Sequence, residues 1–166
     1  VGRLTPRLHA KAFTGGLIVL TFIVVGILGP TVAPYNPNKQ ELTAMTKPPE
    51  GIGSLHVLGT DNLGRDVLSR VIYGARVSLL VAFAVVFISG FIGISLGAIS
   101  GYFGGKTDFA IQKLVEVVWA FPPLLLGITI MAFLGQGLFN LILALVVQRW
   151  VPYSPVVRGQ ALSLRA

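Results

Sequence analysis

Long runs without a charged residue dominate the chain. Three of them cover Ala12–Asn38, Val77–Gly105 and Val117–Gln148. The first contains the apolar segment Phe13–Ala33, whose 21 residues would form a helix long enough to cross a hydrocarbon layer about 30 Å thick. Prolines at the end of this segment stop a helix, because proline lacks the backbone N–H that a helix interior needs. The pattern predicts membrane-spanning helices.

The third run is too long for one crossing. Its 32 residues would make a helix of about 48 Å, and the sequence Gly135-Gln136-Gly137 near its middle is typical of a turn. We therefore predict two spans here, about Val115–Leu134 and Leu138–Val157, joined as an antiparallel hairpin. Together with the first two runs this gives four spans, with both chain ends on one side of the membrane.

Composition supports the same class of protein. Only 11% of the 166 residues are charged, against roughly 25% in soluble domains, and the mean hydropathy is +0.80. The net charge is +7, but the basic residues lie between apolar runs, so membrane topology and anionic lipid explain them better than a nucleic acid partner. The absence of cysteine excludes disulfides, thiol catalysis and cysteine-based metal sites.

The positions of the basic residues predict the orientation. Short segments rich in Lys and Arg remain in the cytoplasm. These residues lie in segment 1–12, in the predicted loop 101–116 and in the tail: Arg3, Arg7, Lys11, Lys106, Lys113, Arg158 and Arg165. The prediction divides the chain into a cytoplasmic segment 1–12, a first span 13–33, a periplasmic segment 34–76 and a membrane core 77–166.

The segment His56–Arg76, HVLGTDNLGRDVLSRVIYGAR, concentrates charge between two apolar runs. It holds three of the 13 basic and two of the six acidic residues. From Leu63 the apolar residues recur at helical spacing, which predicts an amphipathic helix at the outer surface that leads into the second span. A helix with a merely solvated polar face is the alternative.

Two local features of this helix follow from its side chains. Thr60 or Asp61 would cap its start. Asp66 and Arg70, four residues apart, would form an ion pair.

Further along, Gly93 and Gly97 form a GxxxG motif in the second span, which predicts close helix packing.

Several motifs resemble one family. HVLGTDNLGRDVLSRVIYGARVSLLV resembles the signature of the inner-membrane permease subunits of bacterial ABC importers for dipeptides, oligopeptides and nickel. GAISGYFGGKTD, AFPPLLLGI, LGQGLFNLILAL and VVRGQALSLR continue the likeness in order, so that it covers about Tyr35 to the end. The resemblance implies an all-α, polytopic transmembrane helical bundle with an amphipathic periplasmic helix. The family's alanine-rich coupling loop and last two spans do not follow, so we expect an incomplete permease fold, truncated before the coupling loop.

The resemblance also implies a function and a set of partners. The chain would be a multi-pass permease subunit in the bacterial inner (cytoplasmic) membrane, forming part of the path for peptides or a related small solute. The implied partners are a second permease subunit, two cytoplasmic ATPase subunits, a periplasmic or lipid-anchored substrate-binding protein, and membrane lipid. The chain has no phosphate-binding loop or catalytic set, so it would hold no cofactor and no metal, while ATP and Mg would bind the ATPase subunits.

Three other functions compete with that of a peptide permease. An importer of nickel or another metal chelate would carry the same family signature. A structural or assembly subunit would have no transport path of its own. An ion channel would be expected to show a repeated ring-forming polar motif or a filter-like loop, and the sequence has neither.

Four residues are candidates for the translocation path: Pro122, Pro123, Gln148 and Arg149. The two prolines should kink the third span, with or without a hinge motion. An arginine near the middle of a span costs about 2.5–3.5 kcal/mol on insertion scales, so Arg149 should face a cavity or a partner. The alternative is that Arg149 reaches the cytoplasmic interface, beside the interface-type residue Trp150.

Two further groups complete the candidates. The periplasmic helix would contact the binding protein or brace the second permease through Thr60, Asp61, Gly64, Arg65, Asp66, Arg70 and Arg76. The approach to the coupling loop would comprise Arg158, Gly159, Gln160 and Arg165, or its arginines would only anchor the inner interface.

Overall fold

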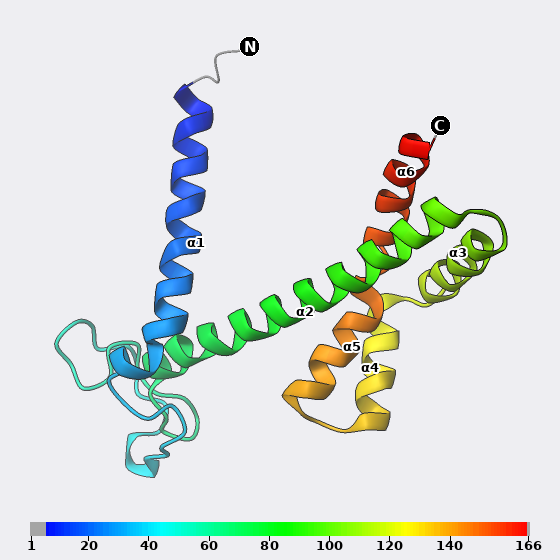
Figure 1. The fold of residues 1–166 in the computed structure, drawn as a ribbon. Helices are drawn as coiled ribbons and strands as arrows, with labels where there is room; N and C mark the ends of the chain where they lie inside the picture. The colour runs from blue at the N-terminus through cyan, green and yellow to red at the C-terminus, as the bar shows by residue number, and fades with distance from the viewer. Residues whose placement is uncertain (1–5, 166) are drawn as a thin grey trace. The chain divides into compact units, whose positions relative to one another are not determined.

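The described part of the chain is helical. The structure is a computed structural model that describes the backbone of residues 6–165 and the side chains of residues 11–164. Among these residues, an isolated bridge between Thr60 and Asp66 is the only strand-like pairing. The elements are α1 (Pro6–Val32), the 3-10 turn η1 (Leu42–Ala44), α2 (Val67–Phe103), α3 (Gly105–Trp119), α4 (Pro123–Leu134), α5 (Leu138–Arg149) and α6 (Tyr153–Arg165) (Figure 1). The predicted all-α class is confirmed.

The described residues form two compact units. The N-terminal unit extends to Leu80 and the C-terminal unit begins at Val81, so that the division falls inside α2.

In the N-terminal unit, the end of α1 packs on the beginning of α2. Gly26 and Gly29 lie at this contact. A Cβ atom on Gly26 would overlap the side chain of Leu79, and one on Gly29 would lie 3.0 Å from the Cγ2 atom of Ile72. Small residues therefore allow the two helices to approach closely, as is common between apolar helices.

The start of α2 differs from the prediction. The helix begins at Val67 rather than at Leu63, and it continues without interruption to Phe103, over 37 residues. The predicted start of the amphipathic helix is therefore wrong: residues 60–66 form a loop, and the apolar stripe from Val67 onward belongs to the first turns of α2. Gly64, with a φ of +70°, holds a backbone conformation that a helix does not contain.

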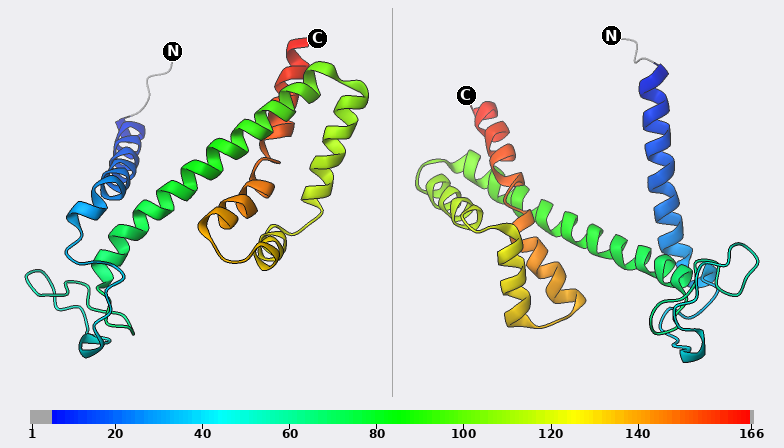
Figure 2. Two further views of the ribbon diagram at one scale, coloured as in Figure 1. Left: turned by 60° about the horizontal axis from the view of Figure 1, so that its bottom comes forward. Right: turned by 180° about the vertical axis from the view of Figure 1, so that it is seen from behind.

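The C-terminal unit is built on a stripe of glycines along α2. Gly93 and Gly97 face the chain between Trp150 and Val157, and a Cβ on Gly97 would lie 2.5 Å from the carbonyl oxygen of Ser154. Gly101 faces α6 in the same way, with Ala161 at 2.5 Å. α6 accordingly runs beside the end of α2 in every view (Figures 1 and 2). The close packing predicted for the GxxxG motif is confirmed.

The third predicted span is broken rather than merely kinked. α3 ends at Trp119, α4 begins at Pro123, and the two helices are bent by 86° at the break. Pro122 precedes α4 with a ψ of 126°, which is outside the helical range. The predicted loop 101–116 is wrong, since α3 already begins at Gly105 and only a tight turn separates it from α2.

The fourth predicted span is also interrupted. α5 ends at Arg149 after 12 residues, and α6 begins at Tyr153. Pro152 lies in the interruption, where its missing N–H and its ring oppose a continuous helix. The predicted turn between α4 and α5 is present, and these two helices pack as a hairpin (Figure 2).

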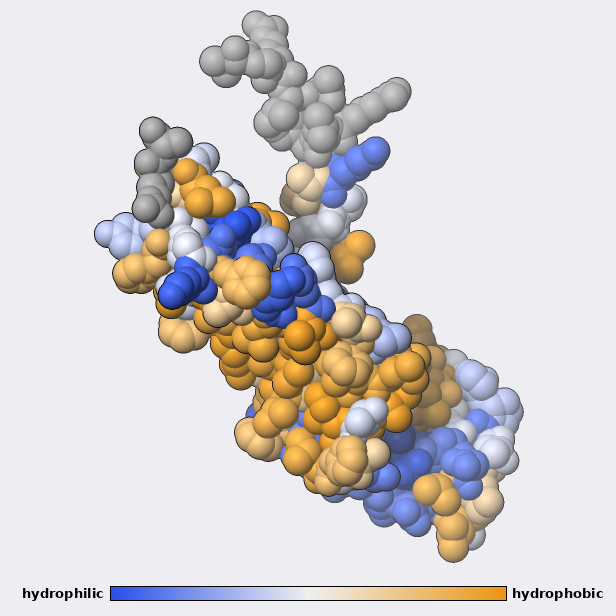
Figure 3. All heavy atoms as spheres, turned by 90° about the vertical axis from the view of Figure 1, so that its right-hand side faces the viewer, coloured by the Kyte–Doolittle hydropathy of each residue, from blue (hydrophilic) through white to orange (hydrophobic). Residues whose placement is uncertain are grey.

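Two described helices are long and apolar enough to cross a membrane. They are Lys11–Val32 and Val67–Phe103, and a third span results if the bent pair α3–α4 counts as one. The four predicted spans are therefore not all present as uninterrupted helices. Large apolar side chains are exposed along these helices, and Figure 3 shows a broad area of hydrophobic side chains. Such a surface needs lipid or other apolar cover, and the chain is an integral membrane protein.

The glycine stripe gives a first test. We expect Gly97→Ala to destabilise the protein by about 1–3 kcal/mol, because its Cβ would meet the backbone of Ser154. Gly90→Ala is the matched control, since nothing lies within 4 Å of a Cβ at this position of the same helix. Thermal unfolding followed by circular dichroism in detergent measures both, and an equal effect of the two variants would contradict the packing.

Candidate functional sites in the polar loop and the helical pocket

The polar loop, residues 33–66, joins α1 to α2 and is held by Thr60. The Thr60 Oγ1 atom accepts a hydrogen bond from the N–H of Lys47 at 2.9 Å and donates one to the carbonyl of Ala44. Backbone bonds from Thr46 to Asp61 at 3.0 Å and from Thr60 to Lys47 at 3.1 Å extend this contact. Two distant parts of the loop are thereby fixed side by side.

Asp61 closes a tight turn within the loop. Its Oδ1 accepts hydrogen bonds from the N–H groups of Leu63 at 2.9 Å and Arg65 at 3.0 Å, and its Oδ2 pairs with the Arg65 guanidinium at 2.8 Å. Partial burial alone would raise the pKa of the Asp61 carboxyl, but the two backbone bonds and Arg65 together lower it to about 2. Asp61 thus shapes the turn and does not cap a helix.

Asp66 caps α2 instead. The residue is 3% exposed. Its Oδ2 accepts a hydrogen bond from the N–H of Ser69 at 2.8 Å, the usual geometry of a helix N-cap. Its Oδ1 lies 3.0 Å from Nδ1 of His56. Burial raises the pKa of Asp66, and the bonds from His56 and Ser69 outweigh it, so that the pKa is lowered.

The predicted helix cap and ion pair are both corrected by this arrangement. Neither Thr60 nor Asp61 caps α2. Asp66 pairs with His56 rather than with Arg70, whose Nη1 lies 3.6 Å from the Oδ2 atom of Asp61. The helical spacing of residues 66 and 70 was misleading because Asp66 precedes the helix and its carboxylate turns back into the loop.

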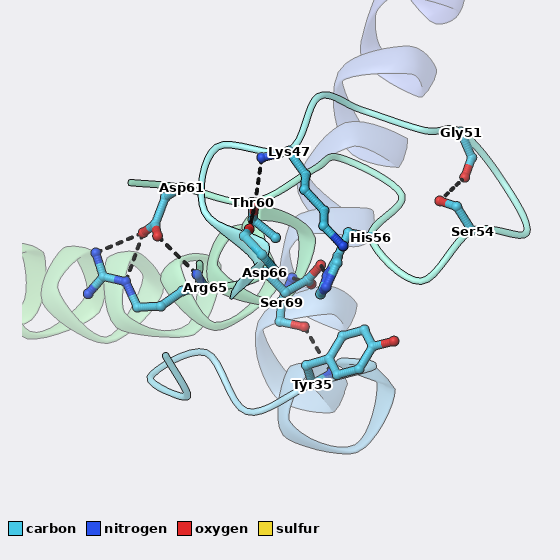
Figure 4. A network of polar contacts seen from close by, with 11 residues as sticks. Tyr35, Lys47, Gly51, Ser54, His56, Thr60, Asp61, Arg65, Asp66 and Ser69 are labelled. Atoms are coloured by element: carbon cyan, nitrogen blue, oxygen red, sulfur yellow. Dashed lines mark hydrogen bonds and ion pairs between the residues drawn. The ribbon is translucent and has the colours of Figure 1, made fainter. Parts of the chain in front are cut away.

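Three residues of this network, His56, Tyr35 and Ser69, were not among the candidates predicted from the sequence. His56 is buried, and its ring lies 5.1 Å from that of Tyr35, centroid to centroid. The N–H of Tyr35 donates to Oγ of the fully buried Ser69 at 3.0 Å (Figure 4). These contacts join residues up to 34 positions apart, and the only hint in the sequence was the place of His56 within the family motif.

Glycine is required at position 64 of the loop. Gly64 has a φ of +70°, and a Cβ atom there would overlap the backbone of Glu41.

Of the seven predicted contact residues, six lie together in or beside this loop, namely Thr60, Asp61, Gly64, Arg65, Asp66 and Arg70. Arg76 lies further along α2 and is exposed.

A pocket of about 820 Å³ lies in the C-terminal unit. Its walls come from the end of α3, from α4 and from α5, and most of its lining is apolar. Three of the four predicted path residues line it: Pro123, Gln148 and Arg149. Pro122 does not line the pocket and lies at the break before α4.

The polar residues of the pocket lie near the end of α5. Gln148 is half-buried, and its Nε2 donates a long hydrogen bond of 3.4 Å to the carbonyl of Ala144. Arg149 is exposed and lies in the last turn of α5, where a positive charge suits the helix dipole. Trp150 is 7% exposed and packs with Val115 and Val151, so it belongs to the core of the unit and not to an exposed interface belt.

A second ionic contact joins α3 to α6. Arg158 donates from Nε and Nη2 to the two carboxylate oxygens of Asp108, both at 2.5 Å. The hydroxyl of Ser100 on α2 donates to the same carboxylate, also at 2.5 Å, and Gln112 donates to Ser100 at 3.1 Å.

The pair was missed because residues 108 and 158 are 50 positions apart, and no local pattern links them.

The other residues predicted near the coupling loop are not part of this contact. Gly159 and Gln160 are exposed on α6, and the side chain of Arg165 lies outside the described side chains. Within the described residues, no three or more His, Asp or Glu side chains come together as metal ligands would.

Comparison with known proteins identifies relatives of the chain. Residues 8–49 match the family described as the N-terminal TM domain of oligopeptide transport permease C. The chain is 39% identical to the dipeptide transport system permease protein DppC of Bacillus subtilis (strain 168), over 93% of this chain and 48% of the relative. The chain is 41% identical to the dipeptide transport system permease protein DppC of Haemophilus influenzae, over 91% of this chain and 54% of the relative.

The oligopeptide transport system permease protein OppC of Bacillus subtilis is 35% identical, over 96% of this chain and 51% of the relative. The chain therefore spans about half the length of the curated relatives it matches. The resemblance to permeases of peptide transport systems, first drawn from the motifs, is confirmed.

Gly64 provides a test of the polar loop. We expect Gly64→Ala to open the loop, because the new Cβ would overlap Glu41, and to increase the rate of protease cleavage within residues 33–66 several-fold, for a cost on the order of 1–3 kcal/mol. Gly51→Ala is the matched control: its φ is also positive, at +87°, but the space around it is open. Equal cleavage of the two variants would contradict the contact with Glu41.

The Asp61 carboxyl gives a pH test. Its pKa is lowered from 3.8 to about 2, so its contribution to stability is complete above pH 3.8 and is lost as the pH falls towards 2. Arg65→Gln should move the pKa back towards 3.8, whereas Arg76→Gln, outside the network, should leave it in place. Carboxyl ¹³C NMR of the protein in detergent measures the midpoint, and a wild-type value near 3.8 would contradict the network.

Proposed function

We propose that this chain forms part of a permease subunit of an ATP-driven importer that carries peptides across the bacterial inner membrane. The observation that carries the proposal is the identity of 35–41% to dipeptide and oligopeptide transport permeases over more than nine tenths of the chain. The names of these relatives support a peptide cargo over nickel or another metal chelate. They also support a transport role over a purely structural one.

The pocket suits a peptide of variable sequence. Its apolar walls can accept many side chains, because the hydrophobic effect has no directional requirement. Gln136, Gln148 and Arg149 provide donors for the groups that all peptides share, the backbone carbonyls and the terminal carboxylate. A bidentate bond from Arg149 to the carboxylate would be the strongest of these contacts.

The proposed orientation follows from the basic residues. The start of α1 and the end of α6 face the cytoplasm, and the polar loop faces the periplasm, where a substrate-binding protein delivers the peptide. The chain crosses the membrane several times. The prefolded surface of the loop, with Arg65 and Arg70 partly exposed, supports a docking role for this segment.

In this proposal, partner subunits supply the energy for transport. Two cytoplasmic ATPase subunits bind ATP and Mg²⁺, and a second permease subunit completes the path. Closure of the ATPases on ATP would switch the permease between outward-open and inward-open states, so that the site faces one side of the membrane at a time. The chain itself acts as a transport subunit and not as an enzyme.

The test is uptake by the full complex in proteoliposomes. With a peptide-loaded binding protein outside and ATP inside, we expect peptide uptake coupled to stimulated ATP hydrolysis. Arg149→Gln should raise the KM for peptide about tenfold, the value of one charge-assisted contact. Lys113→Gln is the matched control, because it neutralises a charge on α3 outside the pocket. A wild-type complex without uptake or stimulation would overturn the proposal.

A further inference from the structure

The pocket of the C-terminal unit has two walls that are joined at both ends. One wall is formed by residues between Val118 and Ala132, and the other by residues between Leu141 and Pro152. At one end, the turn from Leu134 to Leu138 joins them covalently. At the other end, Asp108 precedes the first wall and Arg158 follows the second, and these two side chains bind each other.

The contact between Asp108 and Arg158 has the geometry of a strong pair. Both guanidinium–carboxylate distances are 2.5 Å, and the bidentate arrangement fixes the direction of approach as well as the separation. The side chains are only 19% and 32% exposed, for Asp108 and Arg158 respectively. Ser100 supplies a third hydrogen bond to the carboxylate, and Gln112 in turn holds the hydroxyl of Ser100.

Apart from this contact, the helices that carry Asp108 and Arg158 differ in how closely they pack on the rest of the unit. α6, which carries Arg158, lies directly on α2 through Gly97 and Gly101, whose missing side chains permit backbone contact. α3, which carries Asp108, has one buried residue, Val115. α3 also ends at the 86° break that leads into α4, so a change in its position would move the first wall of the pocket.

We propose that Asp108 and Arg158 form an ionic latch that sets the separation of the two pocket walls. They are thus positioning residues for the cargo held between those walls. The inference rests on the proposed function in one respect, since it takes the pocket as part of the peptide path. With the latch closed, α3 is fixed to the α2–α6 pair and the first wall stays at a defined distance from the second. With the latch open, that distance is free to vary.

Distances measured by electron spin resonance test the latch directly. The chain has no cysteine, so pairs of introduced cysteines can be spin-labelled in the assembled complex with cysteine-free partners. Lys106 on α3 with Leu162 on α6 reports on the latch end, and Phe133 with Phe139 reports on the turn end; all four side chains are exposed.

Four versions of the protein are compared: the wild type, Asp108→Asn, Arg158→Lys and the charge-swapped double variant Asp108→Arg with Arg158→Asp. We expect Asp108→Asn to broaden the 106–162 distances by several ångströms and to leave the 133–139 distances unchanged. Arg158→Lys, which keeps the charge but not the bidentate bond, should have a smaller effect. The swapped variant should recover the narrow distribution. Unchanged 106–162 distances in Asp108→Asn would overturn the latch.

Transport kinetics test the positioning role. Per assembled complex, we expect Asp108→Asn to raise the KM for peptide about tenfold, with a kcat within about twofold of the wild type and with recovery in the swapped variant. A merely structural pair would instead reduce the amount of assembled complex and leave the KM unchanged, which would overturn the positioning role. If the wild-type complex moves no peptide, the proposed function fails, and the distance measurements still decide whether the latch exists.

Discussion

The backbone contact between α2 and the chain from Trp150 to Ala161 determines the architecture of the C-terminal unit. Glycines 93, 97 and 101 leave no side chain between the two segments, so the carbonyl groups of one lie against the surface of the other. Apolar helices have little hydrophobic reason to associate within lipid, and close van der Waals contact provides one. The contact places α6 on α2, which brings Arg158 to Asp108 and holds one end of the pocket.

Three aspartates of this chain organise its structure. Of the six acidic residues in the sequence, Asp61, Asp66 and Asp108 are each bound to a cation or a histidine and to hydrogen-bond donors. A carboxylate that is removed from water needs such partners, because its desolvation is otherwise unfavourable. Each of the three therefore marks a point where separate parts of the chain are fastened together: a turn, a helix start and a junction of three helices.

Local signals in the sequence were sufficient for the helices and for some of their ends. The apolar runs, the departure from a straight helix at Pro122-Pro123, the turn at Gly135–Gly137 and the packing glycines each depend on neighbouring residues or on fixed spacing. The interruption at Pro152 carried the same local signal, but the apolar character of the flanking residues concealed it. The start of α2 was misplaced because Gly64 and the loop contacts override a helical pattern that begins at Leu63. The partners of Asp66 and Asp108 could not be found, since their choice depends on the folded chain.

The polar loop is ordered by its own hydrogen bonds before anything binds to it. Thr60, Asp61 and Asp66 fix its backbone through bonds that span between two and 16 positions of the chain. A flexible segment of this length would lose much of its conformational entropy on binding, and that loss would weaken any complex it formed. Preorganisation removes most of this loss, so that even a small contact surface can support a selective and rapidly reversible encounter with a partner.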